Sequence, residues 1–96
     1  MVLGNFIGTD VTGTASLGNT NQGVLLQTGA TANTVGGTAA GSANVIAGST
    51  DGVYLKTPGT SGNVVVGNLI GTDVTGTAKL GNSRDGVHFA SQVSSN

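Results

Sequence analysis

Asp51 and Asp85 are the residues of this chain whose type and spacing come nearest to a reactive site. Each precedes a Gly-Val pair, and Arg84 stands directly before the second aspartate. Two strands that begin at these residues and lie side by side would hold the carboxylates ~4.8 Å apart. Retaining glycosidases use two carboxyl groups about 5–5.5 Å apart, so Asp51 and Asp85 are candidate catalytic residues.

A solvated turn is the competing interpretation of the same two residues. Asp-Gly is a frequent turn dipeptide, and the third position of this kind in the chain carries Gln22 in place of aspartate. Tyr54 is the only aromatic residue nearby that could support a sugar ring. We therefore predict that Asp51 and Asp85 lie in solvated turns and that the chain has no catalytic residues.

The remaining acidic and imidazole groups predict neither a metal site nor a cofactor site. The chain has 4 acidic residues, all aspartate, and they are spread too widely along the sequence to converge on a calcium ion. His88 is the single histidine, and we predict a surface side chain. The net charge of −1 gives no electrostatic reason to expect nucleic acid or an anionic membrane as a partner.

The motif DVTGT occurs twice, at residues 10–14 and 73–77. It resembles the phosphorylated loop of P-type ATPases, but valine replaces the lysine of that loop. We predict instead a turn in which Asp and Thr side chains bond backbone amides. The repeated threonines also raise an ice-binding surface as a minor alternative, although the sequence Thr-Ala-Ala at residues 38–40 interrupts the array.

These residues must be positioned by a repeated unit. The stretch GNFIGTDVTGTASLGN at residues 4–19 returns as GNLIGTDVTGTAKLGN at residues 67–82, and residues 2–33 match residues 65–96 at 18 of 32 positions. Self-similarity at a fixed offset predicts stacked units that bury apolar side chains against each other. We predict a single domain, residues 1–96, of three coils: segment 1 (about 2–33), segment 2 (about 34–63) and segment 3 (about 64–96).

A coil length of about thirty residues aligns similar residues of the three segments. The predicted columns are Gly23-Val24 with Gly52-Val53 and Gly86-Val87, Asn33 with Asn63 and Asn96, and Leu17 with Ile46 and Leu80. A competing spacing of 21 residues aligns Val24, Val45, Val66 and Val87. We reject that spacing because it separates the Gly-Val pairs.

Period-two alternation along each strand assigns side chains to an inner and an outer face. The side chains predicted to point inward are Val24, Val53 and Val87, then Leu26, Leu55 and Phe89, then Val2, Val35 and Val65, and Ile7 over Ile70. Leu25, Tyr54 and His88 are predicted to point outward. Stacked asparagines can bond amide to amide, so Asn33, Asn63 and Asn96 are predicted to form a ladder.

Composition favours strands over helices. The chain has 18 glycines, 14 threonines and 12 valines, with no glutamate. No apolar run approaches the ~20 residues of a membrane-spanning helix, so we expect no membrane insertion. The first residues also lack the basic and apolar regions of a signal peptide.

The patterns NxVxGNxIG, DGVxL or DGVxF, and SGN or SSN together resemble right-handed parallel β-helix repeats of secreted bacterial proteins, related in fold to pectate lyases. The unit NxIGTDxTGTAxLGN is similar to a repeat of long bacterial surface or exported proteins. The resemblance covers the whole chain. It implies a right-handed parallel β-helix and an extracellular or cell-surface location for the parent protein, but it says little about activity because one solenoid fold carries many functions.

We expect a structural or interaction segment without catalysis of its own, prone to end-to-end self-association through its terminal coils. The alternative is a fragment of a polysaccharide-degrading β-helix enzyme, a lyase or glycosidase, with Asp51 and Asp85 as its acid pair and polysaccharide as its partner. An ice-binding solenoid is the minor alternative.

Overall fold

The computed structural model describes residues 1–90 and 93–96, and all regular secondary structure in those residues is β-strand, as the composition predicts. The strands are β1 (Phe6–Ile7), β2 (Gln22–Leu26), β3 (Thr34–Gly36), β4 (Val45–Ile46), β5 (Asp51–Leu55), β6 (Val64–Val66), β7 (Leu69–Ile70) and β8 (Asp85–Phe89). Within the described residues, nothing helical has the length and apolarity needed to span a bilayer.

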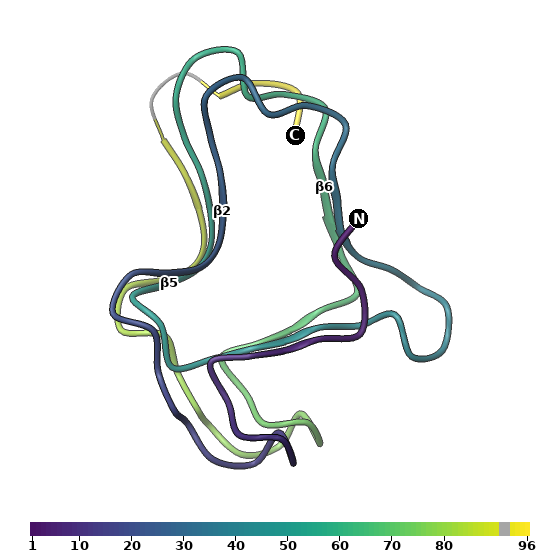
Figure 1. Cartoon of the computed structure of the whole chain (residues 1–96), viewed down its shortest axis with the longest axis vertical. Coiled ribbons are helices and arrows are strands. Elements are labelled where there is room, and N and C mark those ends of the chain that lie inside the picture. Colours follow the sequence, from purple (N-terminus) through teal and green to yellow (C-terminus); the bar gives the residue numbers. More distant parts are fainter. Residues whose placement is uncertain (91–92) are drawn as a thin grey trace.

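The strands form three parallel sheets, and each sheet takes its strands from successive segments. The strand orders are β1-β4-β7, β2-β5-β8 and β3-β6, and Val2 adds a single parallel bridge to Val35 at the edge of the last sheet. Figure 1 shows that the three segments follow nearly the same path around a shared interior. Backbone pairing therefore connects each segment to its neighbours along the sequence repeat.

The strand register confirms the spacing of about thirty residues. Val24 pairs with Val53, and Val53 pairs with Val87. Val45 pairs instead with Phe6 and Leu69, so the spacing of 21 residues does not occur. The predicted column of Val2, Val35 and Val65 is also present.

The predicted column of Leu17, Ile46 and Leu80 is wrong. Ile46 lies between Ile7 and Ile70, which are its partners in the β1-β4-β7 sheet. Leu17 and Leu80 belong instead to two excursions, residues 8–18 and 71–81, which we name the long loops. An antiparallel bridge closes each long loop near its base, Thr9 with Ser16 and Thr72 with Lys79. The chain therefore leaves the stacked strands after Ile7 and after Ile70, and each time it returns beside the same isoleucine. Leu17 and Leu80 lie in these excursions and do not join the column.

The two long loops touch each other although segment 2 has no such loop between them (Figure 1). The amide of Val74 donates to the carbonyl of Gly13 over 2.8 Å. Within each loop an aspartate accepts bonds from a threonine hydroxyl and from backbone amides, which confirms the predicted turn. These bonds, first of all the one from the Thr12 hydroxyl to Asp10 and the one from the Thr75 hydroxyl to Asp73, lower the pKa of each carboxyl.

The fully buried apolar core lies in segment 2. Val35, Ile46, Val53 and Leu55 have no exposed side-chain surface, and apolar residues of segments 1 and 3 that are themselves only partly buried pack against them. Tyr54, between Val53 and Leu55, is half-buried, which confirms the predicted alternation in segment 2.

Glycine precedes the inward valine of each segment, and in segments 1 and 2 a side chain has no room there. A side chain at Gly23 would come within 2.8 Å of Ile46, and one at Gly52 would come equally close to Ile70. Asp51, directly before Gly52, shares the outer face with Tyr54 instead of pointing inward with Val53, and the Arg84 side chain contacts both.

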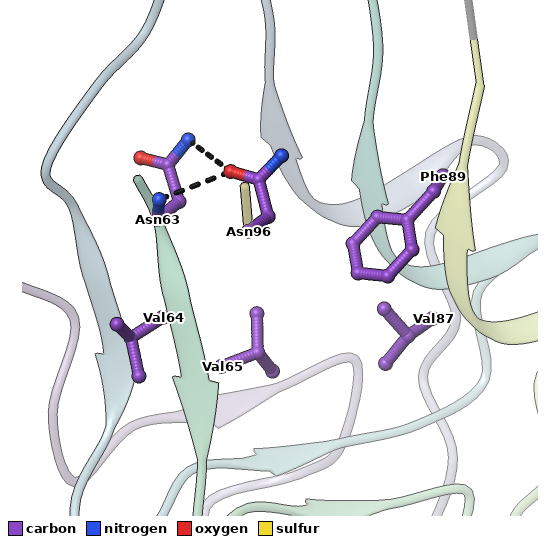
Figure 2. A pocket seen from close by; sticks show the side chains of 6 residues that line it. All are labelled: Asn63, Val64, Val65, Val87, Phe89 and Asn96. Carbon is purple, nitrogen blue, oxygen red and sulfur yellow. Dashed lines mark hydrogen bonds between the residues drawn. The ribbon is translucent and has the colours of Figure 1, made fainter. Parts of the chain in front are cut away.

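Segment 3 ends in an open apolar surface, which we name the C-terminal face. It surrounds a cavity of about 270 Å³ lined by Asn63, Val64, Val65, Val87, Phe89 and Asn96. Figure 2 shows the side chains of Val65, Val87 and Phe89 around this cavity, with the bonded amides of Asn63 and Asn96 at its edge. Val87 is 40% exposed and Phe89 is 55% exposed, although both occupy positions that are buried in segment 2.

Candidate functional site

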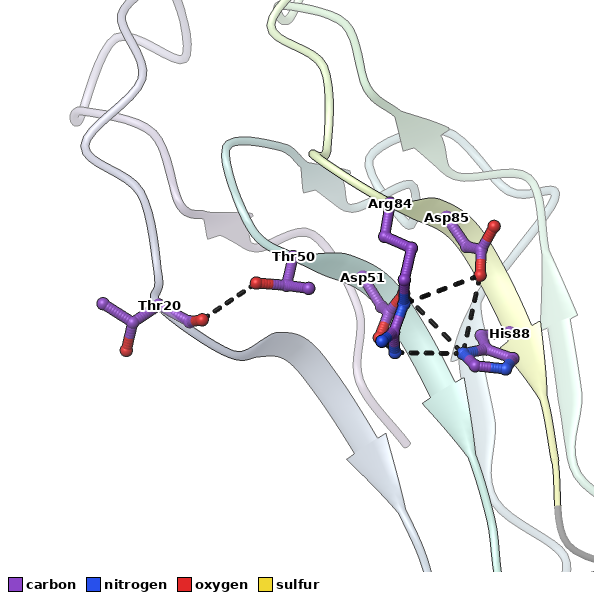
Figure 3. A network of polar contacts seen from close by, with 6 residues as sticks. All are labelled: Thr20, Thr50, Asp51, Arg84, Asp85 and His88. Atoms are coloured by element: carbon purple, nitrogen blue, oxygen red, sulfur yellow. Dashed lines mark hydrogen bonds and ion pairs between the residues drawn. The ribbon is translucent and has the colours of Figure 1, made fainter.

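The two candidate catalytic residues come together on the outer face of the β2-β5-β8 sheet. Asp51 begins β5 and Asp85 begins β8, and the register places them side by side, with Gln22 next to Asp51 in β2. Arg84 and His88 reach the same place from segment 3 (Figure 3). The sequence therefore predicts correctly that these two carboxylates are neighbours.

Asp51 is buried and bound to Arg84, so the prediction of a solvated turn is wrong for this residue. Its side chain has no exposed surface. Arg84 Nε donates to Asp51 Oδ1 over 3.0 Å, and Arg84 Nη2 donates to Oδ2 over 2.6 Å. Hydrogen bonding by Arg84 lowers the pKa of Asp51 below its ordinary value and outweighs the opposing effect of burial. Asp51 is thus held as a carboxylate.

Asp85 and His88 complete the cluster on its exposed side. Asp85 Oδ2 lies 3.9 Å from Arg84 Nε and 3.5 Å from His88 Nδ1, and the aspartate side chain is 46% exposed. His88 points outward, as predicted, but its ring also stacks on that of Tyr54, with 4.4 Å between centroids and an interplanar angle of 4°. The sequence predicts that both rings lie in one outward column. It does not predict that His88 also lies next to the ion pairs.

The cluster suits an ion-pair connection between segments better than acid–base chemistry. A glycosidase needs one carboxyl group that keeps its proton, with a raised pKa, whereas the pKa of Asp51 is lowered. Asp51, Asp85 and His88 do bring potential metal-ligating atoms within 4.8 Å of one another. The guanidinium of Arg84, however, binds both oxygens of Asp51 and supplies the positive charge that a cation would otherwise bring.

Asparagine ladders form a second polar system, and only one of the two ladders was predicted. In the predicted ladder, Asn63 Oδ1 accepts from the backbone and side chain of Asn33, and Asn96 Oδ1 accepts from those of Asn63. The ladder that was missed runs through Asn5, Asn44 and Asn68 in the same manner. Its sequence signal is an asparagine directly before each of β1, β4 and β7.

Comparison with protein-family models, with curated proteins and with solved structures finds no match to this chain. Function is therefore inferred from the chemistry of the two features described above. One is the ion-pair cluster, which joins segments 2 and 3. The other is the C-terminal face, where apolar strand positions are open.

Proposed function

We propose that this chain is a structural module of a right-handed parallel β-helix that works by stacking end to end, within an exported or cell-surface protein. One observation carries the proposal: positions that are buried in segment 2 are exposed in segment 3. Val53 and Leu55 have no exposed surface, whereas their partners Val87 and Phe89 are 40% and 55% exposed. A further unit on the C-terminal face would bury these residues as segment 3 buries those of segment 2.

The open strand edges support the same function. Within the described residues, β6, β7 and β8 each pair with a strand of segment 2 on one side only. Their other edges carry backbone groups that can accept a further strand. A contact between the two different ends of a chain does not close on itself, so repeated association generates filaments. Self-association is thus expected to be progressive and dependent on concentration.

The polar cluster supports a structural role over a catalytic one. Its most buried member, Asp51, is neutralised by Arg84 of the next segment and offers no surface to a substrate. In this position the pair selects the register between β5 and β8, because a slip of one residue would separate the two charges.

Sedimentation velocity over a wide range of concentrations tests the proposal. We expect the average mass of the chain to rise with concentration. Phe89→Asp places a charge on the C-terminal face and should reduce this rise. Ala40→Asp is the matched control, because Ala40 is exposed and belongs to segment 2, which lies between the two ends. It should associate like the parent chain.

Two results would contradict the proposal. One is a folded chain that stays strictly monomeric at the highest concentration. The other is equal association by the Phe89→Asp and Ala40→Asp variants, which would place the contact elsewhere. Circular dichroism at low concentration must accompany the measurement, so that loss of folding in the Phe89→Asp variant is not mistaken for loss of association.

A further inference from the structure

The contact between segments 1 and 2 indicates which kind of repeat unit fits the C-terminal face. Residues 65–96 repeat residues 2–33 at 18 of 32 positions. The surface of segment 3 that faces away from segment 2 therefore carries largely the same residues as the surface of segment 1 that segment 2 covers. Segment 2 therefore indicates the chemistry of the unit that fits the C-terminal face. This step depends on the proposed function, because it assumes that stacking is what the face is for.

The cavity on the C-terminal face lies where the first strand of such a unit would pair. Asn33 is followed by β3, and Asn63, which stacks on Asn33, is followed by β6, which pairs with β3. Asn96 stacks on Asn63 in turn. A strand that followed Asn96 in the same manner would lie along β6. The valine of a Thr-Val-Gly strand would then lie over Val65, as Val65 lies over Val35.

The long loops disfavour a second unit of the segment 1 kind at this face. Segments 1 and 3 are two strand spacings apart, ~10 Å, and their long loops already meet through the bond from Val74 to Gly13. Gly13 is buried in this contact, and a side chain there would come within 2.9 Å of Val74. Two long loops on directly adjacent segments would have half that separation and would crowd each other, which weakens the contact without preventing it.

We propose that the C-terminal face is a binding surface for a short repeat unit with the chemistry of residues 34–63, and that it selects this unit over one of the segment 1 kind. A second copy of the chain offers segment 1 to this face, so self-association is the weaker mode of the same contact. The alternation of long and short units then determines which unit binds next. A short unit has no long loop, so it leaves the space that the long loops of its two neighbours fill.

Two extended chains of nearly equal length test the preference. In the first, residues 1–96 are followed directly by a second copy of residues 34–63. In the second, the matched control, they are followed by a second copy of residues 1–33, so that Val2 of the copy takes the position of Val35 and Val65. Thermal and urea unfolding are measured at a concentration at which sedimentation finds only monomers.

The short extension is expected to raise the melting temperature by several degrees and to increase the urea m value, because it unfolds together with the rest of the chain. The control extension is expected to raise both by clearly less, because its contact with segment 3 is the weaker one.

Equal or greater stabilisation by the control extension would overturn the proposal, as would a short extension that changes neither quantity. Because the measurement is intramolecular, it gives a result even if the parent chain never associates. Failure of this inference can thus be told apart from failure of the proposed self-association.

Discussion

Segments 2 and 3 present the same strand positions to very different surroundings. Val53 and Val87 pair in register, as do Leu55 and Phe89, yet the segment 2 residues are fully buried and the segment 3 residues are not. The strands have the same length and nearly the same sequence pattern, DGVYL and DGVHF. Burial in this molecule therefore comes from having a neighbour on both sides, and a single segment has no private core.

Polar groups follow the same rule. Asn63, in the middle of its ladder, is 2% exposed and bonds to asparagines on both sides. Asn33, at the start of the same ladder, bonds to Asn63 alone among the asparagines. A position near the centre of the stack thus gains hydrogen bonds and loses water at the same time, which makes it the more sensitive position to change.

The largest expected effect is that of Val53→Asp. A charge at this fully buried position has no partner and should cost on the order of 3–5 kcal/mol, a large part of the stability of a domain of this size. Val87→Asp is the matched change in the neighbouring segment and should cost much less, because water already reaches Val87. Tyr54→Asp, on the outer face, should also cost less. Urea unfolding followed by circular dichroism measures all three.

Equal losses at positions 53 and 87 would break the comparison between segments. Equal losses at positions 53 and 54 would instead refute the assignment of the inner and outer faces. The three variants therefore separate the effect of stacking from the effect of strand alternation.

Much of the stacking could be predicted from sequence, because the residues that determine it recur in each segment. The Gly-Val pairs combine a position with little room for a side chain and an inward valine, so their spacing reveals the register. The column of Leu17, Ile46 and Leu80 failed for the opposite reason. Its leucines resemble core residues, but the bridge at the base of each long loop removes them from the stack.

The ion pair between Asp51 and Arg84 was harder to predict because it depends on where the repeats differ. Arg84 stands where the first copy of the repeat has Asn21, and Asp85 stands where it has Gln22. Identity between copies identifies columns, whereas this pair connects a residue of one segment to a substituted position in the next. Only the register and the reach of the arginine side chain bring the two together.

A smaller effect is expected from Asn63→Ala. The change removes the acceptor for the backbone and side chain of Asn33 and leaves buried polar groups without partners, at a cost of about 1–3 kcal/mol. Asn33→Ala is the matched control at the start of the ladder and should cost less, because no other asparagine donates to its side chain within the described residues. A greater loss for Asn33→Ala would show that position in the ladder does not determine the contribution.

The smallest effect is expected from Asp51→Asn, and it should depend on pH. The folded chain lowers the pKa of Asp51 from its ordinary value of 3.8, so ionised Asp51 stabilises the fold above that pH and loses its contribution as the pH falls through the lower, folded value. The gap in unfolding free energy between the parent chain and the Asp51→Asn variant should therefore be wide at pH 7 and narrow toward pH 2. Asp85→Asn is the control, because Asp85 is half exposed and lies 3.9 Å from Arg84 Nε, and its gap should be smaller at pH 7. A gap for Asp51→Asn that stays constant from pH 7 to pH 2 would mean that packing, and not charge, makes this position matter. The cluster would then stabilise the fold by packing, as the apolar core does. The pairing with Arg84 would not help to hold segment 3 in register on segment 2.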